Sequence, residues 1–185
     1  LRDYVPVIHE PTPDKPLHRL IRFHGIENMA GSDMEALHLS QEELEDLCIQ
    51  QLKAGQAVWF ACDAGAFGAR KDGVWDQDSV QYEALLGGFS TDMPKGERLQ
   101  YGSSSATHAM LLTGVHFDGD GKADRWKIEN SWGKDVGDQG YFVCSAKYFK
   151  EYVYEAVIDR RHFSPDQAAM LETEPVVINA WDEDC

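Results

Sequence analysis

The sequence predicts an α+β fold in which helices pack on an antiparallel sheet. Three observations lead to this prediction: short apolar runs typical of strands, a turn rich in glycine and aspartate between two of these runs, and two N-capping boxes that begin helices. The 185 residues suit one domain with a sizeable core, or one lobe of a larger enzyme. The chain begins at Leu1 rather than methionine, which fits a processed or fragment chain, an artificial start or a disordered leader.

The first 73 residues are predicted to contain a loop, a strand, a helix, a second strand and another loop. Prolines at positions 11, 13 and 16 block regular structure, and the half-apolar run 20–24 after them is predicted to be a strand. Ser40 and Glu43 form a capping box, and a helix of about three to four turns should follow. The run 57–62 is apolar throughout, which suits a strand buried on both faces, and the glycine-rich segment 63–73 should be a loop.

The second half of the chain is predicted to add a hairpin, two further strands and two short helices. Strands are predicted at 108–117, 125–130, 140–144 and 153–158. The sequence DGDGK joins the first two strands, so these should form the hairpin. Ser145 should cap a short helix before the last strand. Ser164, with proline at the first helical position, should begin a final helix that runs to about Glu172.

Charge and composition exclude several classes of function. The formal net charge is −15 and the pI is near 4.7, with no run of lysine or arginine to offset it, so binding to nucleic acid is not expected. No apolar stretch approaches about 18 residues, so we expect neither a membrane-spanning helix nor a signal peptide. Four dispersed cysteines do not form a dense disulfide framework, which favours a cytoplasmic location.

Two segments of the second half carry residues in a pattern typical of nucleophilic catalysis. They are THAMLLTG at 107–114 and WKIENSWG at 126–133, and they resemble the histidine and asparagine segments of papain-like cysteine peptidases. A cysteine nucleophile must be a thiolate, so it needs an imidazole within hydrogen-bond reach and a third group that orients this imidazole. His108 and Asn130 are the candidates for these roles, and Trp132 would cover the hydrogen bond between them.

The nucleophile itself is not evident in the chain. The papain-like family places its cysteine roughly 130 to 150 residues before the histidine and asparagine, whereas 107 residues precede His108. Cys48 lies in a helical pattern, and Cys62 and Cys144 end apolar runs, so we expect all three in the core. Cys185 is terminal, and none of the four cysteines has the sequence surroundings of the family's nucleophile.

Further segments resemble one branch of these peptidases, the bleomycin hydrolase and aminopeptidase C family. The matching segments are GQAVWFACD at 55–63, THAM at 107–110, ENSWG at 129–133, EYVYE at 151–155 with DR at 159–160, and AWD at 180–182. The resemblance covers nearly all of the chain. It implies that residues 1–185 are the C-terminal portion of a papain-like peptidase domain, with residues 179–185 as a C-terminal arm.

The resemblance also implies an activity and partners. It implies a cytosolic cysteine aminopeptidase that acts on peptides without a cofactor and assembles as a homo-hexamer. The family's C-terminal arm is thought to hold the substrate's amino group, but here the arm departs from the family after Asp182, so endopeptidase action or a truncated arm are alternatives. The catalytic cysteine and the oxyanion glutamine would come from a missing N-terminal half, so this chain alone is expected to be inactive. The other possibility is a catalytically incomplete lobe that serves assembly or peptide binding.

Weaker signals favour structural roles. The other six histidines show no paired metal-ligand spacing and are expected to be surface or structural residues: His9, His18, His24, His38, His116 and His162. Residues 118–122 resemble part of a calcium loop, but a lysine stands at the third ligand position, so a solvated hairpin turn is expected and no metal site. Asp72, Asp76 and Asp78 should cap turns, or alternatively line the cleft and attract a substrate amino group.

Overall fold

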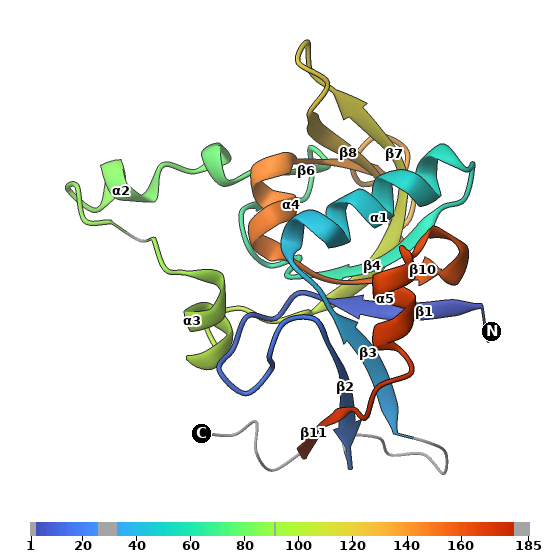
Figure 1. Cartoon of the computed structure of the whole chain (residues 1–185). Helices are drawn as coiled ribbons and strands as arrows, with labels where there is room; N and C mark the ends of the chain where they lie inside the picture. The colour runs from blue at the N-terminus through green and yellow to red at the C-terminus, as the bar shows by residue number, and fades with distance from the viewer. Residues whose placement is uncertain (1–2, 26–32, 91, 180–185) are drawn as a thin grey trace.

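The computed structural model describes residues 3–25, 33–90 and 92–179, and they form one mixed sheet with helices packed on it (Figure 1). In their spatial order, the strands are β11 (Val176–Asn179), β2 (Arg19–His24), β3 (Met34–His38), β1 (Tyr4–Ile8), β10 (Val153–Asp159), β4 (Val58–Cys62), β7 (His108–Phe117), β8 (Ala123–Glu129), β9 (Tyr141–Ser145), β6 (Val74–Trp75) and β5 (Gly68–Ala69). The helices are α1 (Gln41–Lys53), α2 (Tyr82–Leu85), α3 (Lys95–Gln100), α4 (Ala146–Tyr152) and α5 (Pro165–Met170), with 3-10 turns η1 (Gln77–Ser79) and η2 (Arg160–His162).

The main core lies between the sheet and the helices α1 and α4. Leu44 and Leu47 of α1 are buried against the central strands, in one cluster with the aromatic residues of α4. Trp126 of β8 stacks on Phe149 of α4, with ring centroids 4.2 Å apart. Each large apolar side chain removed from water in this way stabilises the fold by about 1.5–3 kcal/mol. The predicted α+β lobe is therefore confirmed. The helices in the described ranges are all too short or too polar to cross a bilayer.

The three predicted helix starts are confirmed. Ser40 Oγ accepts a hydrogen bond from the Glu43 backbone N at 3.2 Å, and Glu43 Oε2 accepts one from the Ser40 backbone N at 3.0 Å. Ser164 begins α5 with a second capping box, and Ser145 caps α4. Helix α5 ends at Met170, slightly before its predicted end.

The predicted strands are also present, with two corrections. Strands β2, β4, β7, β8, β9 and β10 match them, and Asp118 Oδ1 accepts from two backbone N–H groups of the β7–β8 turn, as a solvated hairpin turn requires. Strand β4 is buried on both faces except at Trp59, which is 39% exposed on the face opposite Val58 and Phe60, whereas Ala61 on that same face is buried. The predicted loop 63–73 contains one short strand, β5.

Most neighbouring strands are antiparallel, as predicted, but three pairs are parallel. These pairs are β1 with β3, β2 with β11, and β6 with β9. None of them joins strands that follow one another in the sequence, so no turn motif indicates them. Strands β1, β3 and β11 themselves are missed by the sequence pattern. Pro6 argues against a strand at β1, but it lies beyond the part of β1 that pairs with β3, where the missing N–H is tolerated.

A buried lysine joins three helices. Lys95, at the start of α3, is only 8% exposed, and its Nζ donates to Gln41 Oε1 at 2.8 Å and to the carbonyl oxygens of Val153 at 2.6 Å and Lys150 at 3.2 Å. The last two carbonyls lie at the C-terminal end of α4, where a positive charge is favourable. Burial lowers the pKa of Lys95 to about 7.

The carboxyl group of Glu155 is expected to make the stability of the fold depend on pH. Glu155 lies on β10, and its burial, with a smaller contribution from Glu10, raises its pKa to about 7. A carboxyl whose pKa is higher in the folded state binds more protons when folded, so stability falls as pH rises from about 4.5 to 7. Glu155→Gln should therefore raise the free energy of unfolding by roughly 1–2 kcal/mol at about pH 8 and leave it unchanged near pH 4.

Urea unfolding at the two pH values measures this effect. Glu97→Gln, which replaces an exposed carboxylate on α3, is the matched control and should give the same small change at both pH values. An equal stability change for Glu155→Gln at both pH values would contradict the prediction.

Candidate active site

The hairpin of β7 and β8 brings the two candidate site residues together. His108 is the first residue of β7 and Asn130 directly follows β8, and the register pairs the start of one strand with the end of the other. His108 Nε2 lies 2.9 Å from Asn130 Oδ1. Because the Ser131 backbone N also donates to Oδ1, at 2.7 Å, this atom is the acceptor and His108 Nε2 is the donor. The proton of a neutral imidazole then sits on Nε2, and Nδ1 is left with a free lone pair.

Trp132 forms an aromatic wall beside this pair. Its ring stacks on the His108 ring with centroids 4.9 Å apart and planes inclined by 15°. The Trp132 ring also contacts the ring of Trp75 and meets the ring of Phe142 edge to face. A hydrogen bond next to apolar rings is shielded from water, which strengthens it electrostatically. The structure thus brings the three sequence-predicted residues into the arrangement that a catalytic role would need.

A close approach of glycines fixes the loop that follows Asn130. At Gly137, whose φ is +62°, a Cβ atom would lie 2.4 Å from the Tyr141 carbonyl oxygen. At Gly73, a Cβ atom would lie 2.6 Å from the Gly137 Cα atom. Neither position has room for a side chain, so both glycines are needed for the loop 131–140 to pack closely.

His108 opens onto a cleft of about 440 Å³. The cleft is lined by Ala64, Gly65, Gly68, Arg70, Trp75, Thr107, His108 and Trp132. Thr107 Oγ1 accepts from the Ala64 backbone N at 3.1 Å, which holds the loop after β4 next to the residue before His108. The sequence pattern does not indicate Arg70 or Thr107, because nothing local to the loop 63–73 shows that it returns to the start of β7.

The described cysteines do not supply a nucleophile at this site. Cys62 occupies the register position opposite His108, but its thiol is buried, and burial raises its pKa to about 12. Burial likewise raises the pKa of Cys48 and of Cys144, and both are fully buried. The prediction that these three cysteines belong to the core is confirmed. Cys185 lies outside the described residues.

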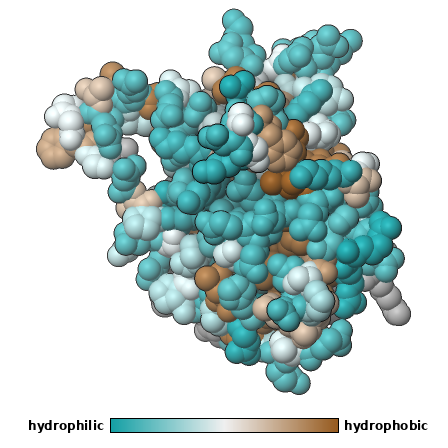
Figure 2. Space-filling model, turned by 45° about the horizontal axis from the view of Figure 1, so that its top comes forward, coloured by the Kyte–Doolittle hydropathy of each residue, from teal (hydrophilic) through white to brown (hydrophobic). Residues whose placement is uncertain are grey.

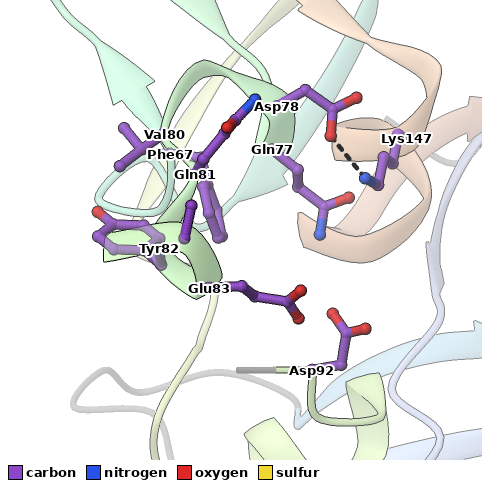
Figure 3. A pocket seen from close by; sticks show the side chains of 10 residues that line it. Phe67, Gln77, Asp78, Val80, Gln81, Tyr82, Glu83, Asp92 and Lys147 are labelled. Atoms are coloured by element: carbon purple, nitrogen blue, oxygen red, sulfur yellow. Dashed lines mark hydrogen bonds and ion pairs between the residues drawn. The ribbon is translucent and has the colours of Figure 1, made fainter. Parts of the chain in front are cut away.

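Asp72, Asp76 and Asp78, in and after the glycine-rich loop, do not line this cleft. Asp76 Oδ1 accepts from Ser145 Oγ at 3.0 Å and from the Asp78 backbone N at 3.2 Å, and Asp78 pairs with Lys147 Nζ at 2.8 Å. Figure 3 shows the latter pair at the edge of a second hollow, formed by η1, α2 and α4. The prediction of turn capping is thus confirmed for Asp76, and neither Asp72, Asp76 nor Asp78 lines the cleft at His108.

The remaining histidines are surface or structural residues, as predicted. His38 is fully buried and is hydrogen-bonded to the Pro16 carbonyl oxygen and the Glu10 backbone N. His18 and His116 are exposed and lie beside carboxylates. In the described part of the chain, no group of three His, Cys, Asp or Glu side chains converges as a metal site would require.

Comparisons with known proteins show which sequences and structures this chain is similar to. The family model described as Peptidase C1-like family matches residues 1–184. Aminopeptidase C of Lactococcus lactis subsp. cremoris is 39% identical over 183 residues, which cover 98% of this chain and 42% of the relative. Bleomycin hydrolase of Homo sapiens is 37% identical over 186 residues, which cover 98% and 41%. The crystal structure of PepW from Lactobacillus rhamnosis has a TM-score of 0.93 and 39% identity over 98% of this chain and 41% of its own. The chain thus spans about two fifths of the length of these relatives.

Proposed function

The chain belongs to the peptidase C1-like family, and on this premise we propose that it supplies the histidine and asparagine of a cysteine aminopeptidase site. The observation that carries the proposal is the 2.9 Å hydrogen bond between His108 Nε2 and Asn130 Oδ1 beneath the stacked ring of Trp132. An amide oxygen can orient an imidazole and fix its tautomer without adding a charge. This arrangement suits an imidazole that acts as a general base and acid.

In the proposed mechanism, His108 is the general base and acid. Its Nδ1 takes the proton of a cysteine thiol, and the thiolate then attacks the substrate carbonyl. The imidazolium returns a proton to the leaving amine, and in the second stage it activates the water that releases the acyl group. Asn130 holds the ring in place throughout. The cysteine and a glutamine that stabilises the oxyanion would come from a segment outside these 185 residues.

The proposed substrates are peptides with a free amino terminus. Both bleomycin hydrolase and aminopeptidase C are among the relatives, and the second name specifies an aminopeptidase. The expected C-terminal arm, which would hold the amino group, falls outside the described residues except for Asn179 in β11. The proposal includes a cytoplasmic location and no cofactor, nucleic acid or membrane as partner.

The test uses a polypeptide that contains this chain together with the cysteine-bearing segment. Peptides with free and with acetylated amino termini are compared, with and without a thiol-alkylating reagent. The proposal expects cleavage of the free peptides only, one residue at a time, and its loss after alkylation. Equal cleavage of acetylated peptides would show an endopeptidase. No cleavage at all would contradict the peptidase role and leave assembly or peptide binding as the function of this chain.

An exposed apolar projection around α2, called the α2 arm below, favours a second candidate function in assembly. The segment around α2 extends away from the body of the molecule (Figure 1), and apolar surface lies at its end (Figure 2). Leu85, Leu86 and Phe89 on this arm are 75%, 55% and 76% exposed. Large apolar side chains gathered on a projection are typical of contact surfaces. In this candidate function the α2 arm contributes to the contacts between copies in a homo-hexamer.

Replacing Leu85 and Phe89 by serine is therefore expected to shift the assembly toward smaller species. Sedimentation velocity of the complete protein measures the shift. Serine at Val177, an exposed apolar residue on β11, is the control and should leave the sedimentation coefficient unchanged. If the Leu85 and Phe89 variants sediment like the parent protein, the α2 arm does not hold the assembly together.

A further inference from the structure

Arg70 places a positive charge at the cleft. Its side chain comes from the loop between β5 and β6, is exposed, and lines the same hollow as His108. Its guanidinium carbon lies 4.4 Å from the centre of the Trp132 ring, which in turn stacks on His108. Within the described ranges, no carboxylate forms an ion pair with Arg70. Other arginines of this acidic chain do have carboxylate partners, as Arg98 has Glu151 and Arg161 has Asp159.

The cation–π contact with Trp132 leaves Arg70 able to bind an anion. An aromatic ring attracts the charge of a guanidinium but takes up few of its five N–H donors, so the others stay free to donate. These donors match the two oxygen atoms of a carboxylate in a bidentate arrangement. Asp72, two residues further along the same loop, forms no ion pair with Arg70, and Asp63, which directly follows β4, accepts from the Gly65 backbone N and Ser104 Oγ instead. Because no carboxylate in the described part of the chain forms an ion pair with Arg70, its N–H groups are open to the carboxylate of a bound molecule.

The position of Arg70 indicates which part of a substrate it would meet. In the proposed mechanism, His108 returns its proton to the leaving amine, so the departing part of the peptide passes beside the imidazole. Trp132 and Arg70 line the cleft next to this ring. We propose that Arg70 is a substrate-binding residue that holds a carboxylate of the departing part of the peptide. This inference rests on the proposed peptidase function and names a substrate class for it.

Two sources of the carboxylate are possible, and substrates can separate them. One is an acidic side chain on the departing residue, and the other is the C-terminal carboxylate of a short peptide. The first is measured with amidated dipeptides that end in Asp or Asn, and the second with dipeptides that end in a free or an amidated alanine. An exposed arginine and carboxylate pair changes rates by up to about 5-fold, so this is the preference expected for the complete enzyme.

The expected result is that kcat/KM is about 5-fold higher for at least one of the two carboxylate substrates than for its neutral match. Arg70→Gln should reduce this ratio to about 1, and Arg70→Lys should keep part of it because lysine retains the charge but not the fork. Arg125→Gln, at an exposed arginine of β8 outside the cleft, is the control and should keep the ratio. An unchanged ratio in Arg70→Gln would overturn the proposal, as would an equal loss for charged and neutral substrates, which would mean that Arg70 only supports Trp132.

A binding measurement separates this inference from the proposed function. The Trp132 indole and His108 ring signals of this chain are followed by NMR while glycyl-aspartate amide, glycyl-asparagine amide, or glycyl-alanine with a free or an amidated terminus is added. Stronger binding of a carboxylate peptide that is lost in Arg70→Gln would support the role of Arg70 even if the complete protein cleaves nothing. Equal binding of charged and neutral peptides would overturn it even if the complete protein is an active peptidase.

Discussion

A preparation that contains only these 185 residues is expected to hydrolyse aminoacyl and peptide substrates no faster than a buffer blank. The thiol of Cys62, which lies opposite His108, is buried, and burial raises its pKa to about 12, so it stays protonated at neutral pH. Cys48 and Cys144 are fully buried in the core. The oxyanion donor is expected from outside the chain as well, and losing one such donor typically costs about 10²–10³ in rate.

Fluorogenic aminoacyl amides provide the assay, and intact mass under denaturing conditions establishes what the preparation contains. A single 20.8 kDa species without activity is the expected result. A second polypeptide with a papain-type cysteine segment, accompanied by activity, would identify a two-chain enzyme that uses His108 and Asn130. Activity that a thiol-alkylating reagent abolishes, in a preparation with only the 20.8 kDa species, would contradict the prediction.

Replacing His108 by alanine in the complete enzyme is expected to lower kcat/KM by about 10³-fold or more. The substitution removes both the base that forms the thiolate and the acid that protonates the leaving amine. Asn130→Ala should cause a smaller loss, because it removes only the group that orients the imidazole. Since Asn130 acts through His108, the double variant should be about as active as His108→Ala alone.

Steady-state kinetics of the three variants measures this pattern, and thermal unfolding shows whether each variant is folded. His116→Ala is the matched control, because His116 lies on the same strand β7 but is exposed and pairs with Asp124 outside the cleft. It should leave kcat/KM within about twofold of the parent. If a folded His108→Ala enzyme kept more than about a tenth of its kcat/KM, another residue would have to be the base.

The parts of the structure that the sequence predicts are those set by neighbouring residues. The capping box of Ser40 and Glu43 and the turn at Asp118 each satisfy their hydrogen bonds within a few residues, so their patterns are readable in the chain. The pairing of His108 with Asn130 also follows from one hairpin. Their proposed catalytic role comes from resemblance to a family and from chemistry, and it stays a prediction until it is measured.

The parts that the sequence does not predict depend on contacts between distant segments. Strand β1 is stabilised by pairing with β10 near the other end of the chain, which outweighs the local effect of Pro6. Lys95 is buried only because Gln41 and the end of α4 surround its amine. Arg70 reaches the cleft because its loop folds back toward Trp132. None of these arrangements leaves a periodic or motif signal in the sequence.

The short separation between His108 and Asn130 has a consequence for the order of folding. They lie 22 residues apart in one hairpin, whereas β1 and β10 pair Tyr4 with Asp159. The entropy lost on closing a loop grows with its length, and hairpins form within about 1–10 μs. The β7–β8 contact can therefore form early and independently of the distant pairings. Partial opening of the far side of the sheet would leave this hairpin protected from hydrogen exchange, while the outer strands β11, β2 and β3 exchange first.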